Sequence, residues 1–455
     1  MSAKLTICGA AGGVTGSCYH LALDGVAVVI DAGIFQGGRE ADDLNHRPTP
    51  FDPTTVDAIV LTHGHLDHTG RVPLLVDRGF RGPIHGHAAT LDIGLLIMED
   101  TAKIGARSET PLYDRRPVDE VRTRLHRHAY RQPFEIGPFR FELFDAGHIL
   151  GSAHVRVSWQ TKAGARALLF SGDIGVVGTP IIRDPFTAWA PEHAVDAIVT
   201  ESTYGDQPHP DRAEAHDRFR TVIKRALADG GKVLIPAFAI GRTQEILYEL
   251  HQLVQAGDVG RIPVIVDGPL SLSTTELYRR YRGLYDEAAL ELVEAGDHPL
   301  ELDTFIGTRD GRQSAKIADI DGPAIIIAGS GMCNGGRIRG HLARYLPDPR
   351  TDVLLVGYQG ARTLGRALQD GASEVWLDGA QVPVRGRVTR LSGMSAHADQ
   401  NGLAAWYQHV PRKPGATTIV THGDDDARAI YARLLTDRFG ARTVVPDLFD
   451  VLPLD

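Results

Sequence analysis

Residues 62–70 have the sequence Thr62-His63-Gly64-His65-Leu66-Asp67-His68-Thr69-Gly70. They follow an apolar run at 58–61, which predicts a buried strand that ends in a polar loop. Neutral imidazole and carboxylate are ligands that Zn²⁺ takes in proteins, at about 2.0–2.2 Å. Because four such ligands lie within this loop, it can serve two metal ions. We expect His63 and His65 on one ion, and Asp67 and His68 on the other.

Composition bounds the class of protein. The chain has 455 residues, more than one ordinary domain, and predicts two or three. The 43% of hydrophobic and 23% of charged residues are typical of a soluble globular protein. No segment resembles a signal peptide or approaches the roughly 20 apolar residues that span a bilayer. Three widely spaced cysteines favour buried thiols over disulfides or a cysteine zinc site. We therefore expect a cytoplasmic protein without a membrane partner.

The net charge leaves the class of substrate open. A value of −9 argues against a generally basic surface for nucleic acid. It does not exclude a local site for phosphate, because bound cations can supply much of the attraction.

Further ligand candidates follow other predicted strands. His148 follows a strand predicted at 139–144, Asp173 one at 167–170, and His422 one at 418–421. Together with the first loop, they supply a third imidazole for one ion and a carboxylate able to bridge both. Asp31 ends a hairpin predicted at 18–30 and is expected to orient the metal loop.

The other histidines lack this position at a strand end and are interpreted as packing or surface residues. These are His85, His87, His126, His128 and His154. The region from Leu91 to Arg131, which contains two of them, is predicted to be mainly helical.

From about residue 206 the sequence changes to an alternation of strands and helices. Amphipathic helices are predicted at 213–228 and 243–255, and short apolar strands at 233–235, 264–266, 324–328 and 353–356. Continuously apolar strands are expected in a parallel sheet that is covered on both faces. The pattern predicts a doubly wound α/β domain.

Glycine-rich turns lead from strands into helices in this domain, at 239–242, 329–337 and 360–366. A helix N-terminus with a nearby arginine suits a phosphate group, although turn chemistry alone explains each turn taken separately. The residues expected to contact substrate phosphate are Arg242, Ser330, Arg337, Thr363 and Arg366.

Together these motifs resemble the beta-CASP branch of the metallo-β-lactamase superfamily, the nuclease group of RNase J and the pre-mRNA 3′-end cleavage endonuclease. Besides the first loop, the motifs that carry the resemblance lie at 9–11, 31–33, 171–173, 201–205, 235–238, 329–332, 395–397 and 422–423. The resemblance implies an αββα sandwich formed by residues 1–205 and 391–455. A doubly wound α/β beta-CASP domain, residues 206–390, would interrupt it.

The resemblance also implies the roles of the site residues. One zinc ion would be held by His63, His65 and His148, and a second by Asp67, His68 and His422, with Asp173 between them. Such a pair of ions activates a water for attack on a phosphodiester. Catalytic roles are implied for Asp67, Glu201 and His397. His397 would act as the general acid and Glu201 would orient it. The expected cofactors are two Zn²⁺ per chain, and the expected substrate is single-stranded RNA.

Several alternatives stay open. A DNA-directed nuclease shares the phosphate chemistry, and nothing in the sequence visibly reads a 2′-hydroxyl. A small-molecule metallo-hydrolase would lack the long insert with Glu201 and His397, and a non-catalytic RNA-binding subunit would hold no metal. Endonuclease or exonuclease mode, the pathway of RNA processing or decay, and a homodimer are also left open.

Overall fold

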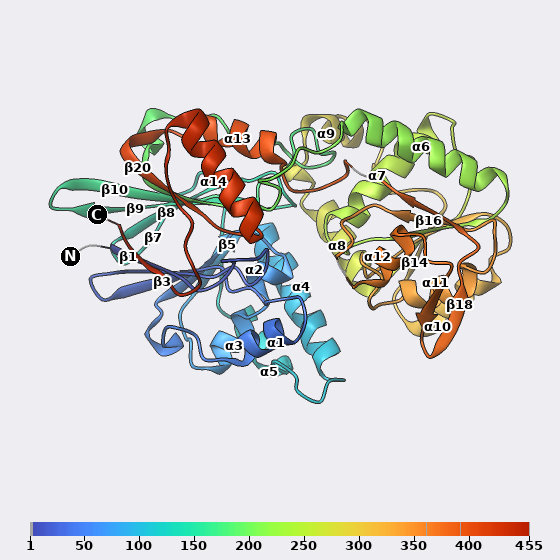
Figure 1. The fold of residues 1–455 in the computed structure, drawn as a ribbon, viewed down its shortest axis with the longest axis horizontal. Coiled ribbons are helices and arrows are strands. Elements are labelled where there is room, and N and C mark those ends of the chain that lie inside the picture. Colours follow the sequence, from blue (N-terminus) through green and yellow to red (C-terminus); the bar gives the residue numbers. More distant parts are fainter. Residues whose placement is uncertain (1–2, 361, 392, 455) are drawn as a thin grey trace. The chain divides into compact units, whose positions relative to one another are not determined.

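The computed structural model describes residues 3–360, 362–391 and 393–454 (Figure 1). Ala361 and Ser392, which belong to two of the motifs above, lie outside the described residues. The contacts divide the chain into two compact units, residues 1–208 with 397–455 and residues 209–396. The sequence-based division placed these boundaries after residues 205 and 390.

The first unit contains two seven-stranded sheets. The first sheet, in spatial order, consists of β22 (Val451–Leu454), β1 (Ala3–Ile7), β2 (Tyr19–Leu23), β3 (Val26–Ile30), β4 (Ala58–Leu61), β5 (Ile84–His87) and β6 (Leu125–His128). The second sheet consists of β21 (Arg442–Val444), β20 (Arg412–Val420), β11 (Val195–Thr200), β10 (Gly164–Phe170), β9 (Ala153–Thr161), β8 (Phe139–Asp145) and β7 (Phe134–Ile136).

Helices accompany both sheets of this unit. They are α1 (Arg39–His46), α2 (Leu66–Thr69), α3 (Val72–Asp77), α4 (Ala88–Gly105), α5 (Arg115–Arg122), α13 (Gln400–His409) and α14 (Asp425–Phe439). Among the described residues, no helix is both long enough and apolar enough to cross a membrane.

The side chains of β4 explain why its sequence is continuously apolar. Val60 packs between the two sheets, with Phe141 of the second sheet in the same cluster. Its neighbours Ile59 and Leu61 face the opposite way and pack with α3 and α4. The second sheet is covered in the same manner by α13 and α14. Both faces of each sheet are therefore buried, and the αββα sandwich is confirmed.

The prediction that residues 91–131 are mainly helical is wrong at its C-terminal end. After α4 and α5, residues 125–128 form the edge strand β6, which pairs in parallel with β5 and sets His85 opposite His126. Neither strand has an apolar run, so local sequence does not reveal them. Ring stacking stabilises these polar strands in place of an apolar run. The ring centroid of Phe134 lies 5.1 Å from that of His85 and 3.8 Å from that of His128.

The second unit contains a six-stranded sheet whose neighbouring strands are all parallel. In spatial order it consists of β14 (Phe305–Thr308), β13 (Val264–Asp267), β15 (Ala324–Ala328), β12 (Lys232–Pro236), β16 (Asp352–Leu355) and β19 (Arg387–Arg390), and a separate pair is formed by β17 (Glu374–Leu377) and β18 (Ala380–Pro383).

Helices lie on both faces of the parallel sheet. They are α6 (Arg212–Ala228), α7 (Arg242–Gln255), α8 (Pro269–Arg280), α9 (Glu287–Glu294), α10 (Gly311–Ala315), α11 (Ile338–Tyr345) and α12 (Leu364–Gln369) (Figure 1). Leu234 of β12 packs in one cluster with Leu342 of α11. Val233 and Ile235 point to the opposite face, where α6 contacts β12. The predicted doubly wound α/β insert is confirmed.

Candidate metal centre

The ligand candidates of the first unit all lie at strand ends. His63, His65, Asp67 and His68 occupy the segment from the end of β4 through α2, His148 follows β8, Asp173 follows β10, and His422 follows β20. The backbone packs closely around the first loop. A Cβ atom added to Gly33 would lie 1.5 Å from the carbonyl oxygen of Asp67. Any side chain at position 33 would therefore displace the loop that carries four of the seven residues.

Three imidazoles and one carboxylate form the first cluster. The Nδ1 atom of His65 lies 3.2 Å from Nε2 of His63 and 3.2 Å from Nε2 of His148. The Oδ2 atom of Asp173 lies 3.3 Å from Nε2 of His63 and 3.7 Å from Nε2 of His148. The ligand atoms of these four residues all lie within 4.8 Å of one another, close enough to hold one ion.

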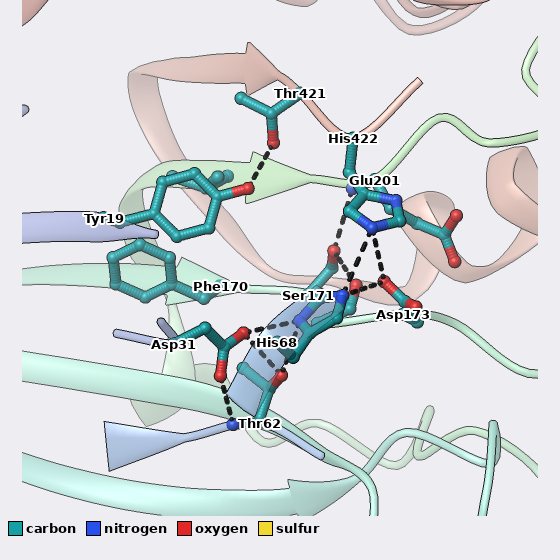
Figure 2. A pocket seen from close by; sticks show the side chains of 12 residues that line it. Tyr19, Asp31, Thr62, His68, Phe170, Ser171, Asp173, Glu201, Thr421 and His422 are labelled. Atoms are coloured by element: carbon teal, nitrogen blue, oxygen red, sulfur yellow. Dashed lines mark hydrogen bonds and ion pairs between the residues drawn. The ribbon is translucent and has the colours of Figure 1, made fainter. Parts of the chain in front are cut away.

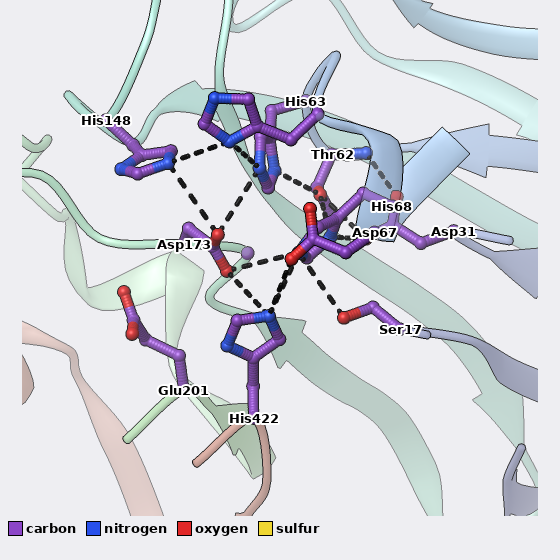
Figure 3. A network of polar contacts seen from close by, with 12 residues as sticks. Ser17, Asp31, Thr62, His63, Asp67, His68, His148, Asp173, Glu201 and His422 are labelled. Carbon is purple, nitrogen blue, oxygen red and sulfur yellow. Dashed lines mark hydrogen bonds and ion pairs between the residues drawn. The ribbon is translucent and has the colours of Figure 1, made fainter. Parts of the chain in front are cut away.

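A second cluster lies on the other side of Asp173 (Figure 3). Here Nε2 of His68 lies 3.2 Å from Nε2 of His422. The other oxygen of Asp173, Oδ1, is 3.3 Å from His68 and 3.6 Å from His422. Asp67 completes the group, with its Oδ2 atom 3.7 Å from Nε2 of His422 and 4.0 Å from that of His68. The structure thus brings together all seven residues proposed from the sequence, and each oxygen of Asp173 faces one cluster.

The chemistry of these groups fits metal ions. Both oxygens of Asp173 are buried, and neither accepts a hydrogen bond from a described residue. Four ligands in a tetrahedron at about 2.0–2.1 Å from Zn²⁺ stand about 3.3–3.4 Å apart. The distances of 3.2–3.7 Å in the first cluster match that spacing. A buried carboxylate without donors, ringed by imidazole nitrogens at this spacing, is expected of a metal-binding group.

The electrostatics of the two clusters differ. Burial lowers the pKa of His63 and His148, and burial together with His63 lowers that of His65 to about 3. These rings are therefore neutral near pH 7, the form that binds metal. Burial also acts to lower the pKa of His68, but Asp173 and Asp31 outweigh it and raise the pKa. A proton therefore competes with a metal ion more strongly for His68 than for the histidines of the first cluster.

Neighbouring side chains orient two of the ligands. Asp31 accepts a hydrogen bond from the Thr62 backbone N–H at 2.8 Å, and its Oδ2 atom lies 2.7 Å from Nδ1 of His68 (Figure 2). On the other side, Oγ1 of Thr203 lies 3.1 Å from Nδ1 of His422. Sequence reasoning proposed Asp31 but missed Thr203, although Thr203 stands in the motif at 201–205. Contacts to the distal ring nitrogen fix the orientation of a metal-binding histidine.

Glu201 and His397 lie beside the first cluster. Nδ1 of His397 is 3.5 Å from Oε2 of Glu201 and 3.9 Å from Oδ2 of Asp173. Glu201 is buried and accepts hydrogen bonds from the backbone N–H groups of Ile174 and Thr203, so its position is fixed. Burial acts to lower the pKa of His397, but Glu201 outweighs it, and the pKa is raised to about 9. The His397 side chain is 23% exposed, so a substrate can reach it.

The residues proposed to contact phosphate all lie in the second unit, and each has a partner there. Arg242 is paired with Glu245, Arg337 with Asp267, and Arg366 with Asp370, while Ser330 bonds with the backbone of Gly335 and Thr363 caps α12. The guanidinium of Arg337 also donates to the carbonyl oxygens of Thr308 and Arg309. Arg337 therefore ties its loop to the ends of β13 and β14, whereas Arg242 and Arg366 pair with carboxylates one turn further along their own helices.

Comparisons with known proteins cover nearly the whole chain. Residues 11–237 match the metallo-beta-lactamase superfamily, residues 243–368 the Beta-Casp domain, and residues 381–446 the Zn-dependent metallo-hydrolase RNA specificity domain. Ribonuclease TTHA0252 of Thermus thermophilus is 35% identical over 430 residues, which are 94% of this chain and 95% of that protein. Transcription termination factor FttA of Cenarchaeum symbiosum is 34% identical over 439 residues, which are 92% of this chain but 66% of that longer protein.

A solved structure shares the fold. The crystal structure of a protein of unknown function from Enterococcus faecalis aligns over 100% of both chains, with a TM-score of 0.60 and 12% sequence identity. At this identity the likeness concerns the architecture alone.

Proposed function

This chain belongs to the metallo-beta-lactamase superfamily, in the branch that carries a Beta-Casp domain, and from this membership we propose that it is a zinc-dependent ribonuclease. The observation that carries the proposal is the pair of ligand clusters on the two oxygens of Asp173. RNA as the substrate is supported by the match to an RNA specificity domain and by the ribonuclease of Thermus thermophilus.

We assign the seven ligands to two ions. His63, His65 and His148 would hold one, and Asp67, His68 and His422 the other, with Asp173 on both. When bound, two zinc ions supply an activated water and neutralise charge that develops on the phosphate. Asp31 keeps the ring of His68 in place and Thr203 that of His422, which preserves the arrangement during turnover.

Proton donation is assigned to His397. Cleavage toward a 3′-hydroxyl product leaves an oxygen that needs a proton, and a side chain positioned for this step typically contributes about 10²–10⁴-fold to the rate. Burial acts against protonation of the ring, but Glu201 raises its pKa to about 9 and so favours the protonated form. The ion pair of Nδ1 with Oε2 of Glu201, at 3.5 Å, keeps the ring beside the first cluster. We expect products with 5′-phosphate and 3′-hydroxyl ends.

Substrate contacts in the Beta-Casp domain are a separate part of the proposal. Arg242, Ser330, Arg337, Thr363 and Arg366 follow strands of a parallel sheet, at the edge where open α/β sheets bind ligands. A phosphate at Arg337 would compete with Asp267 for the same guanidinium. We therefore propose that the turn at 329–337 contacts the substrate as a whole and not through Arg337 alone. The proposed ligand is single-stranded RNA, and the proposed role is in RNA processing or decay. The cysteines are free and buried, which suits a reducing cytoplasm as the site of action.

Metal content gives the first test. Five imidazoles among seven ligands favour zinc over magnesium, which prefers oxygen ligands and retained water. Elemental analysis of protein purified without chelator should find about two zinc ions per chain, in keeping with the two clusters. Magnesium as the sole tightly bound metal would contradict the assignment.

Cleavage products give the second test. Zinc-loaded protein is incubated with RNA and with DNA of the same sequence, each labelled at either end, and the products are sized. We expect RNA to be cut and a chelator to abolish cutting. Preferential cutting of DNA would show that DNA, and not RNA, is the substrate. If neither nucleic acid is cut, the proposal that the protein is a nuclease is wrong. The pattern from the two labels also distinguishes internal cleavage from removal of terminal nucleotides.

A further inference from the structure

Two aromatic side chains are exposed at one edge of the parallel sheet in the Beta-Casp domain. Phe238 follows β12 and is 46% exposed, and Tyr358 follows β16 and is 58% exposed. The two strands are neighbours and run in parallel. Both rings therefore leave the sheet at its carboxyl edge, and their loops lie in the same unit.

Glycines next to these rings let them pack on backbone. A Cβ atom added to Gly331 would stand 3.0 Å from two ring carbons of Phe238, and one added to Gly357 would stand 3.9 Å from its Cε2. A Cβ atom at Gly360 would stand 3.9 Å from Cε1 of Tyr358. A side chain at Gly331 would therefore crowd the Phe238 ring, and about half of each ring-bearing side chain stays open to solvent.

A buried amide holds these glycines together. Gln359 is 2% exposed, and its Nε2 atom donates to the carbonyl oxygens of Gly331 at 3.0 Å and Gly357 at 3.1 Å. Those are the two glycines at which an added Cβ atom would meet the Phe238 ring. The loops after β15 and β16 are also joined by a hydrogen bond from Gly365 N–H to the carbonyl oxygen of Met332 at 3.1 Å. The loops that carry and flank the rings are therefore joined to one another before any ligand arrives, which lowers the entropic cost of binding.

Two arginines belong to the segment that follows Tyr358, and one of them, Arg366, is paired with Asp370. Arg362 is exposed in the same loop, and Arg366 lies near enough to Tyr358 for the phenol to raise the pKa of the arginine, after the larger effect of Asp370. Aromatic faces beside arginines are the means by which proteins bind single strands without reading sequence, because every base has a π-face. A protein partner would instead need a contiguous apolar patch, and the residues beside Tyr358 in its loop, Gly357, Gln359, Gly360 and Arg362, do not supply one.

We propose that Phe238 and Tyr358 form a stacking platform for nucleobases of single-stranded RNA. The inference rests on the proposed ribonuclease function and adds the part of the substrate that the domain grips. The bases would stack on the rings, while Arg362 and the sugar-phosphate backbone interact through charge. Stacking of the bases would then add to the binding of the sugar-phosphate backbone, and the protein would not prefer one RNA sequence.

Binding to two oligomers tests the platform. One is an oligouridylate with nuclease-resistant phosphorothioate linkages, and the other is an abasic ribose chain of the same length and linkage. For the oligouridylate, Phe238→Ala should weaken binding by about 5- to 150-fold, the value of stacking on one base. Affinity for the abasic chain should not change, and Phe238→Tyr should retain the affinity for bases. Phe449→Ala is the matched control, since Phe449 is also 46% exposed but lies in the other unit.

The outcomes separate this inference from the function on which it rests. If the unsubstituted protein binds and cuts RNA but Phe238→Ala and Tyr358→Ala bind the oligouridylate equally well, the platform is wrong and the ribonuclease stands. Equal losses on both oligomers would also overturn stacking, since the abasic chain has no bases to stack. If the unsubstituted protein neither binds nor cuts RNA, the proposed function itself fails.

Discussion

Asp173→Ala is expected to lose both metal ions and, with them, measurable RNA cleavage. Its two oxygens each face one ligand cluster, at 3.3 Å from His63 and 3.3 Å from His68. Loss of a residue that merely orients a ligand typically costs about 10- to 100-fold in metal affinity, so loss of a shared ligand should exceed about 100-fold. The measurement is zinc content after dialysis, alongside single-turnover cleavage of labelled RNA.

A control separates the metal effect from general damage. Asp196 lies in the same unit, on β11, where it pairs with Arg166 and Lys413 away from the clusters. Asp196→Ala should keep both zinc ions and most of the cleavage activity. If Asp173→Ala retains about two zinc ions per chain, Asp173 does not bridge the clusters, and the assignment of seven ligands fails.

His397→Ala should slow single-turnover cleavage by about 10²–10⁴-fold while leaving the zinc content and the affinity for RNA nearly unchanged. Its Nδ1 atom faces Glu201, and it is not one of the seven ligands. Since Glu201 acts through His397, adding Glu201→Ala should cost much less than the product of the two separate losses. Loss of a zinc ion from His397→Ala would instead make His397 a ligand.

The pH dependence tests the same assignment. A general acid must be protonated, so cleavage should decline as pH rises through its pKa. Glu201 raises the pKa of His397 to about 9 against the effect of burial, and two bound cations would lower it again, so the decline should lie at or below about pH 9. His397→Ala should lack this decline. A substrate whose leaving oxygen needs no proton should recover most of the lost rate.

The metal loop was predictable because its chemistry is local. An apolar strand followed by closely spaced histidines needs no knowledge of distant residues, and Val60 with its neighbours explains why that strand is apolar throughout. Asp173 and His422 could be proposed because they too follow apolar strands. β5 and β6 could not, because their polar sequences are held by pairing and by the ring of Phe134.

Contacts between distant residues also limited the prediction of substrate-binding residues. Arg337 follows a glycine-rich turn and resembles a free phosphate ligand in sequence. In the fold it meets Asp267, a buried carboxylate 70 residues away that also lies 2.7 Å from Nε2 of His341. Phe238 was not proposed at all, because its significance depends on glycines contributed by two other loops. Position after an apolar strand therefore revealed the metal-ligand candidates, whereas the ion-pair partner of Arg337 and the glycines near Phe238 carry no such signal in the sequence.

The position of the last ligand in the chain bears on how the protein is made. A nascent chain synthesised through residue 396 holds six of the seven ligands but lacks His397 and His422, and β20, the partner of β11, has yet to emerge from the ribosome. N-terminal segments emerge and begin to fold first. If His422 is a zinc ligand and His397 the general acid, as proposed above, we expect cleavage to begin only when residues 397–455 have been synthesised and have joined the first unit.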